Sequence, residues 1–262
     1  MAAVIELENS EWSLISGLFD PPGRQGAPSK YPRRKIVNAM LFIARPGIQW
    51  RYLPDRYPPW PAVWQQGRRW RNNGVWDRAM VKLAHAIRRS KNRQADPSMV
   101  MIDGQSVRGG RSGPTFHNAG GRGGHTIGAK RSIVIEILGL PVAVRVDPAR
   151  PHDVKVGREP LNDEIKANHL PRLAAIVADR GYAGLGRLAA RHHLKLDIKQ
   201  PPKGTVGFTP LAPLYRVENA FAHLGRWRRL SRCYEGREMS AEAWLEVAAV
   251  AYMFALIRAE PT

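Results

Sequence analysis

The first third of the chain repeats apolar residues three and four positions apart, between short breaks rich in proline, glycine and asparagine. This spacing predicts amphipathic helices that bury one side. Short helices in such a series allow a helix-turn-helix arrangement. The expected helices begin near Asn9, at Arg33, at Pro58 and after Gly74.

From residue 99 the pattern changes to short apolar runs typical of strands, with amphipathic segments between them. A glycine-rich stretch from Gly109 to Gly128 is expected to be a loop. This order predicts an α/β fold with a mixed sheet. The expected strands are 99–102, 132–138, 142–146, 174–178 and 194–199, and the expected helices are 154–169, 185–193, 213–227 and 241–258.

The change of pattern divides the chain into a helical region, 1–95, and an α/β region, 96–262. The helical region holds 17 Lys and Arg against 6 Asp and Glu, and six of the eight tryptophans. We expect most of these tryptophans in the core. We predict that the helical region binds DNA.

Composition narrows the classes of partner. The chain of 262 residues carries 41 Lys and Arg against 22 Asp and Glu, a net charge of +19, which favours a polyanionic partner such as nucleic acid. The most apolar stretch, 248–257, is too short to span a bilayer, so we expect a core helix and no membrane partner. Cys233 is the only cysteine, which excludes disulfides within the chain and fits a reducing cytoplasm.

Three acidic residues occupy notable positions in this basic chain. Asp103 and Asp179 each end a short apolar run and precede a turn, and Glu218 stands on a helix face that is otherwise apolar. Read singly, the aspartates are equally well explained as turn formers. For Glu218 the alternative is a structural ion pair with Arg216 or with a distant arginine. Read together, strand-terminal carboxylates suit Mg²⁺, which prefers hard oxygen ligands.

Two such ions about 4 Å apart activate a nucleophile for in-line phosphoryl transfer. Water as the nucleophile gives strand cleavage, and a DNA 3′-hydroxyl gives strand transfer. The sequence contains no His-Glu-x-x-His motif, no Gly-x-Ser-x-Gly elbow and no phosphate-binding Walker loop. A zinc hydrolase, a serine hydrolase and the use of ATP are therefore not indicated.

Clustered arginines are candidate contacts to DNA phosphates. One cluster is Arg68, Arg69 and Arg71, for which a solvated helix face is an equal alternative. A second cluster follows Glu218 and comprises Arg226, Arg228, Arg229 and Arg232. The His152-Asp153 pair is a candidate either for the same cleft or for fixing a loop.

Several runs resemble the transposases of the bacterial insertion sequence 5 family. The run 215–230, Tyr-Arg-Val-Glu-Asn-Ala-Phe-Ala-His-Leu-Gly-Arg-Trp-Arg-Arg-Leu, resembles the glutamate segment of that family. The runs 102–107 and 178–182 resemble its two aspartate segments. The runs 44–54 and 58–64 resemble its DNA-binding region, so the resemblance covers nearly the whole chain in the expected order.

The resemblance implies an RNase H-like mixed-sheet core preceded by a helix-turn-helix-like DNA-binding region. It implies that Asp103, Asp179 and Glu218 bind Mg²⁺ or Mn²⁺ and catalyse DNA cleavage and strand transfer at terminal inverted repeats. Lys130, Arg216 and Arg226 would contact DNA ends. The family often has Tyr and Arg seven and four residues before the glutamate and a basic residue seven after it, where this chain has Leu211, Leu214 and Gly225.

The implied partners are double-stranded DNA, both transposon ends and target, and at least a second copy of the chain in a synaptic assembly. The implied location is the bacterial cytoplasm, in association with the nucleoid. Two other functions stay open: a DNA-binding protein that has lost catalysis, and an RNase H-type nuclease without strand transfer.

Overall fold

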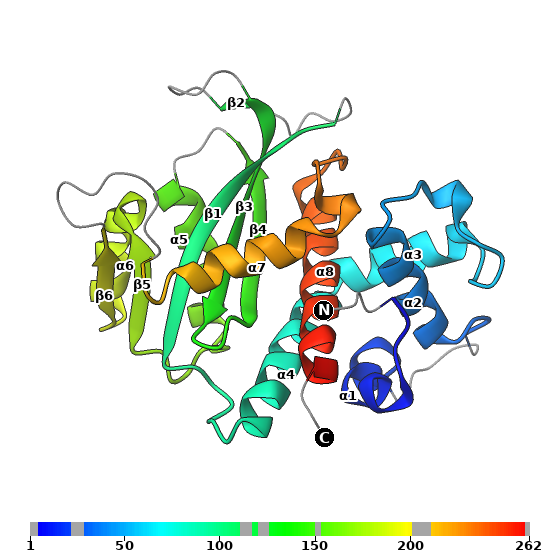
Figure 1. Ribbon diagram of the computed structural model, residues 1–262, viewed down its shortest axis with the longest axis horizontal. Coiled ribbons are helices and arrows are strands. Elements are labelled where there is room, and N and C mark those ends of the chain that lie inside the picture. Colours follow the sequence, from blue (N-terminus) through cyan, green and yellow to red (C-terminus); the bar gives the residue numbers. More distant parts are fainter. Residues whose placement is uncertain are drawn as a thin grey trace.

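The computed structural model describes residues 5–21, 29–110, 117–119, 126–149, 153–200 and 211–259 (Figure 1). The four predicted N-terminal helices are confirmed within a few residues, and a 3₁₀ turn lies between the second and the third. These elements are α1 (Asn9–Phe19), α2 (Arg33–Ala44), η1 (Trp50–Tyr52), α3 (Trp60–Asn72) and α4 (Val75–Ser90).

An aromatic cluster holds these helices together. Phe19 of α1 makes edge contacts with Trp70 of α3 and Trp76 of α4, at centroid distances of 4.8 and 4.7 Å. Both tryptophans are buried, as predicted. Trp60 and Trp64 of α3 are instead exposed, at 36% and 45%.

The sheet is mixed, as predicted. Its strand order is β2-β3-β1-β5-β6, and β4 also pairs with β3. β3 pairs antiparallel with both β1 and β4, whereas β5 and β6 continue the sheet parallel to β1. The strands are β1 (Met99–Arg108), β2 (His117–Ala119), β3 (Thr126–Glu136), β4 (Pro141–Pro148), β5 (Ala175–Asp179) and β6 (Lys195–Lys199).

Three strands are longer than predicted, and the largest extensions are in β1 and β3. Their pairing is continuous from Val100↔Glu136 to Arg108↔Gly128, which extends β1 six residues past the predicted end, and β3 begins at Thr126, six residues early. The prediction that Asp103 ends its strand is therefore wrong, because the backbone hydrogen bonds to β3 continue the strand beyond it. Asp179 does end its strand.

Helices cover both faces of the sheet. α5 (Asp153–Lys166) and α7 (Tyr215–Gly225) both pack on β1 and β3, and Figure 1 shows α7 crossing in front of the strands with α5 behind them. η2 (Arg180–Leu185) and α6 (Gly186–Arg191) connect β5 to β6, and η3 (Arg228–Leu230) follows α7.

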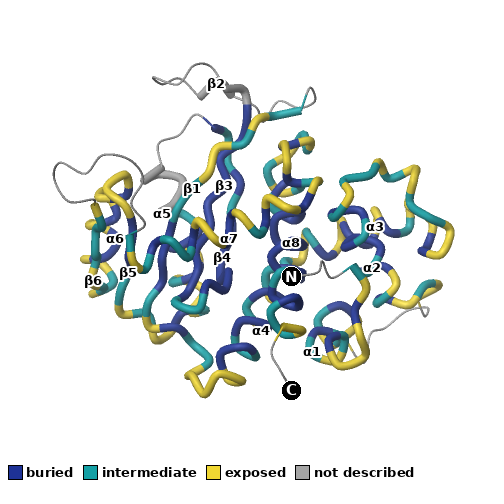
Figure 2. Tube along the Cα trace, in the orientation of Figure 1, coloured by how far each residue is buried: buried dark blue, intermediate teal, exposed yellow. Residues whose placement is uncertain are grey.

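The last helix, α8 (Glu238–Ala259), joins the helical region to the sheet. It packs on α2 and α4 on one side and on β4 and α7 on the other. It is long and apolar enough to cross a membrane, but its most apolar 18-residue window is 72% buried inside the protein, as expected of a core helix (Figure 2). Near its end, the Arg258 guanidinium donates to both Glu11 carboxylate oxygens, at 2.7 and 2.8 Å, and so fastens α8 to α1.

Candidate active site

The two aspartates lie on neighbouring parallel strands. The register of β1 with β5 ends at Ile102↔Ala178, and Asp103 and Asp179 are the next residue on each strand. Adjacent residues on paired parallel strands share a face of the sheet. The fold therefore brings together two carboxylates that are 76 positions apart in sequence.

Glycines make room around these aspartates. The Gly104 amide donates to Asp103 Oδ1 at 2.7 Å. A Cβ atom on Gly104 would lie 2.8 Å from the hydroxyl of buried Tyr182, and one on Gly181 would lie 3.0 Å from Asp179 Oδ1. The Asp-Gly and Asp-Arg-Gly-Tyr motifs are thus in contact. Gly104 leaves room for the Tyr182 hydroxyl, and Gly181 leaves room for the Asp179 carboxylate.

We predict that Gly104→Ala lowers the free energy of unfolding by about 1–3 kcal/mol, because the new methyl group overlaps the Tyr182 hydroxyl. Tyr182→Phe removes that oxygen. The double variant should therefore be more stable than the sum of the two single changes implies, as measured by urea unfolding of all four proteins. Strict additivity would show that the contact does not limit Gly104.

Glu218 lies in the first turn of α7 and is exposed. The helix buries Val217, Ala220 and Leu224. Of the apolar residues predicted to share the face of Glu218, Leu214 and Phe221 are buried, whereas Ala222 and Gly225 are exposed. The Glu218 carboxylate therefore stays in contact with solvent, because α7 packs an adjacent face against the sheet.

Strand alternation assigns Asp103 to the face that α7 covers. Asp103 pairs with Ile133, so Arg131, two residues away on β3, shares its face. Arg131 donates to the carbonyl oxygens of Leu230 at 2.6 Å and Arg232 at 3.4 Å, both in the segment after α7. The Arg131 side chain is buried, which lowers its pKa to about 10. It anchors the segment after α7 to the sheet beside Asp103.

The three carboxylates do not form one tight cluster. Among the described residues, the acidic and imidazole groups whose ligand atoms all lie within 4.8 Å are Asp77, Glu164 and His169, and not Asp103, Asp179 and Glu218. A single ion bound by all three carboxylates is not favoured by this arrangement.

The predicted basic residues divide into exposed and internal ones. Arg68, Arg69 and Arg226 are exposed, and the Arg68 guanidinium lies 5.8 Å from the centroid of the Trp64 ring. Arg216 is half-buried and lies over the ring of its neighbour Tyr215. Arg68, Arg69 and Arg226 therefore present their positive charge at the surface, where a ligand can reach it.

The other residues predicted to contact DNA interact with groups inside the protein or are buried. Arg71 donates to Ser240 Oγ at 2.8 Å, and burial lowers its pKa. Arg229 pairs with Glu235 and lies 5.1 Å from the centroid of the Trp244 ring. Lys130 is buried, and alternation puts it on the sheet face opposite Asp103. Its location does not favour the predicted contact with DNA ends near Asp103.

Sequence reasoning missed the two exposed tryptophans of α3. Trp60, Trp64 and Arg68 are spaced by four residues, so they lie along one side of the helix. This four-residue spacing is the sequence signal that could have indicated a shared, exposed side of the helix. His152 lies outside the described residues, and Asp153 begins α5 without a described side chain.

Comparison with known proteins gives consistent matches. Residues 7–80 match a family model described as transposase of the IS4/5 family, and residues 94–207 match one described as transposase DDE domain. The second span includes Asp103 and Asp179 and ends before Glu218.

Two proteins, both with 'uncharacterized' in their names, are similar to this chain in sequence. The chain is 32% identical over 108 residues to the insertion element IS402 uncharacterized 16.2 kDa protein of Burkholderia cepacia, covering 39% of this chain and 72% of that protein. It is 36% identical over 105 residues to the uncharacterized protein y4sN of Sinorhizobium fredii, covering 39% and 75%. No solved structure matches.

Proposed function

The chain belongs to the IS4/5 family of transposases, and from that premise we propose that it binds the terminal inverted repeats of an insertion sequence and catalyses DNA cleavage and strand transfer there. The observation that carries the proposal is the placement of Asp103 and Asp179 side by side on the face that α7 covers. Glu218, exposed on the first turn of α7, is the third carboxylate of the proposed site.

These residues would hold Mg²⁺ or Mn²⁺ through hard carboxylate oxygens. Two ions about 4 Å apart, each about 2.1 Å from its ligands, can join outer carboxylates up to about 8 Å apart. The three carboxylates need not lie within 4.8 Å of one another if they bind two metal ions and not one. When bound, such ions activate a water or a 3′-hydroxyl and stabilise the leaving oxygen.

The strand topology supports an RNase H-like core. An antiparallel β1-β3-β4 unit, extended by β5 and β6 parallel to β1, is the arrangement of that fold, with helices on both faces. We assign DNA binding to the helical region 1–95 and catalysis to 96–262. α8 packs against both regions, so they would act as one body.

Arg68, Arg69 and Arg226 are the proposed contacts to DNA phosphates, because they are exposed and positively charged. Binding of two element ends implies at least a dimer on DNA. We place this activity in the bacterial cytoplasm, at the nucleoid.

The test uses a labelled DNA end carrying the inverted repeat that flanks the coding region. With Mg²⁺ we expect specific strand cleavage, and a pre-cut 3′-hydroxyl end should join to target DNA; EDTA should abolish both. Binding without cleavage would identify a DNA-binding protein that has lost catalysis. Cleavage without joined products would identify an RNase H-type nuclease.

A further inference from the structure

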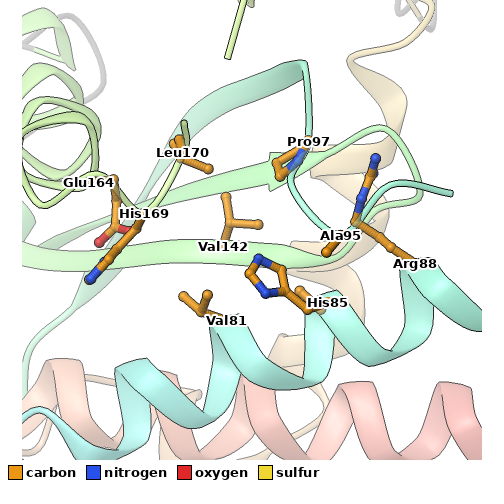
Figure 3. Close-up of a pocket in the computed structure, with 10 residues that line it drawn as sticks. Val81, His85, Arg88, Ala95, Pro97, Val142, Glu164, His169 and Leu170 are labelled. Carbon is orange, nitrogen blue, oxygen red and sulfur yellow. The ribbon is translucent and has the colours of Figure 1, made fainter. Parts of the chain in front are cut away.

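An acidic cluster lies away from the proposed cleavage site. It comprises Asp77 in the first turn of α4, Glu164 near the end of α5, His169 just beyond α5, and Glu242 and Glu246 on α8. Asp77, Glu164 and His169 each offer a ligand atom, and these atoms all lie within 4.8 Å of one another. Figure 3 shows Glu164 and His169 side by side above α4. We call these five residues the α4–α5–α8 cluster.

The carboxyl groups of this cluster outnumber the cationic groups beside them among the described residues. Glu246 is only 9% exposed, and in the described part of the chain it forms no hydrogen bond or ion pair. Burial, together with the nearby charges of Glu242 and Asp77, raises the pKa of Glu246 to about 8. A buried carboxylate without a partner is costly, and a cation is the partner that relieves it.

The nearby arginines are engaged elsewhere. Arg78, whose charge reaches Asp77, is exposed and donates to the Asn73 carbonyl oxygen at 2.6 Å. Arg145, whose charge reaches Glu242, already forms ion pairs with Asp147 at 3.2 Å, Glu159 at 2.8 Å and Asp163 at 3.4 Å. Glu242 accepts one hydrogen bond, from the Val146 amide at 3.1 Å. Burial raises the pKa of Glu242 to about 7. Within the cluster, His169 is the one group that can carry positive charge.

The contact between His169 and Glu164 has the geometry of two ligands on one ion. His169 Nδ1 lies 3.1 Å from Glu164 Oε2. Two atoms that far apart, each about 2.1 Å from a metal, subtend about 95° at it, which suits tetrahedral or octahedral coordination. An imidazole ligand favours Zn²⁺ or Mn²⁺ over Mg²⁺, which prefers oxygen alone.

We propose that Asp77, Glu164 and His169 bind one divalent transition-metal ion, Mn²⁺ or Zn²⁺, and that Glu242 and Glu246 supply negative charge around it. The site joins α4 of the helical region to α5 on the sheet. Its role is to stabilise the fold, since α7 and the three carboxylates assigned to DNA cleavage lie on the opposite face of the sheet from α5.

The test is metal binding by the full chain in the absence of DNA. Chelator-stripped protein carrying Asp103→Asn, which removes a ligand of the proposed cleavage site, is titrated with Mn²⁺, Zn²⁺ and Mg²⁺ by calorimetry. We expect one Mn²⁺ or Zn²⁺ per chain and a rise in Tm of roughly 5 °C at saturation. Adding Asp77→Asn or His169→Gln should weaken binding at least about tenfold and remove the rise.

Asp163→Asn is the matched control, because Asp163 lies next to Glu164 in α5 but pairs with Arg145. It should bind metal like the parent. If no Mn²⁺ or Zn²⁺ binds, or if Asp77→Asn and His169→Gln both bind like Asp163→Asn, the proposal is wrong. Should Asp77→Asn fail to fold, His169→Gln decides alone, with loss of the imidazole-nitrogen signal in Mn²⁺ electron spin-echo spectra as its second readout. DNA cleavage is not measured, so this site can fail while the transposase function stands.

Discussion

Asp103→Asn is expected to reduce Mg²⁺-dependent cleavage of a labelled transposon end by at least about 10³-fold while leaving the fold intact. The amide keeps an oxygen that can accept the 2.7 Å hydrogen bond from the Gly104 amide, so the local backbone needs no rearrangement. The substitution removes the negative charge that binding of the two proposed metal ions requires. The measurement is the single-turnover cleavage rate, with the circular dichroism melt recorded alongside.

Asp163→Asn is the control for this change. Asp163 lies on α5, on the opposite face of the sheet from α7, and its side chain is 61% exposed. It should cleave like the wild type. Asp103→Cys adds a test of direct coordination, because a thiolate binds Mn²⁺ better than Mg²⁺ and should restore activity selectively with Mn²⁺. Near-normal cleavage by Asp103→Asn would remove Asp103 from the catalytic set.

Arg88→Met is expected to lower the free energy of unfolding by about 3–5 kcal/mol. Arg88 of α4 pairs with Glu136 at the end of β3, and their side chains are 6% and 0% exposed. Burial raises the pKa of Glu136 even beside the arginine, so loss of Arg88 leaves a buried carboxylate with no opposite charge. Urea unfolding measures the difference.

A second variant separates the lost pairing from lost packing. In Arg88→Met/Glu136→Gln the buried charge is gone, and the glutamine oxygen can still accept from the Leu138 and Leu140 amides, at 2.7 and 3.2 Å. It should recover more than half of the loss. Arg89→Met, at an exposed neighbouring position, should change stability by less than about 0.5 kcal/mol. Equal effects at positions 88 and 89 would show that the ion pair contributes nothing.

Local patterns predicted most of the elements. The helices of the first ninety residues follow from apolar spacing and from breaks such as Pro21 and Gly74, because these signals lie within one or two turns. The extension of β1 to Arg108 does not follow from such signals, since its second half has few apolar residues. It depends on hydrogen bonds to β3, a partner about thirty residues away.

For the candidate site, the sequence indicated which residues to consider but not how their elements are oriented. The motifs around Asp103 and Asp179 predict a shared metal site, and the parallel register of β1 and β5 brings these two aspartates together. The buried face of α7 depends on how the helix lies on the sheet, so the sequence misjudged the surroundings of Glu218. Lys130 was predicted from a resemblance, but its strand position puts it on the far face.

The position of α8 in the chain has a consequence for synthesis on the ribosome. The helices up to Ser90 lack one of their packing partners until residues 238–259 have been translated. At elongation speeds of roughly 5–20 residues per second, the emerging N-terminal helices wait on the order of 10–30 s with apolar surface uncovered. Nascent chains of this protein are therefore expected to need chaperone protection until the final helix docks.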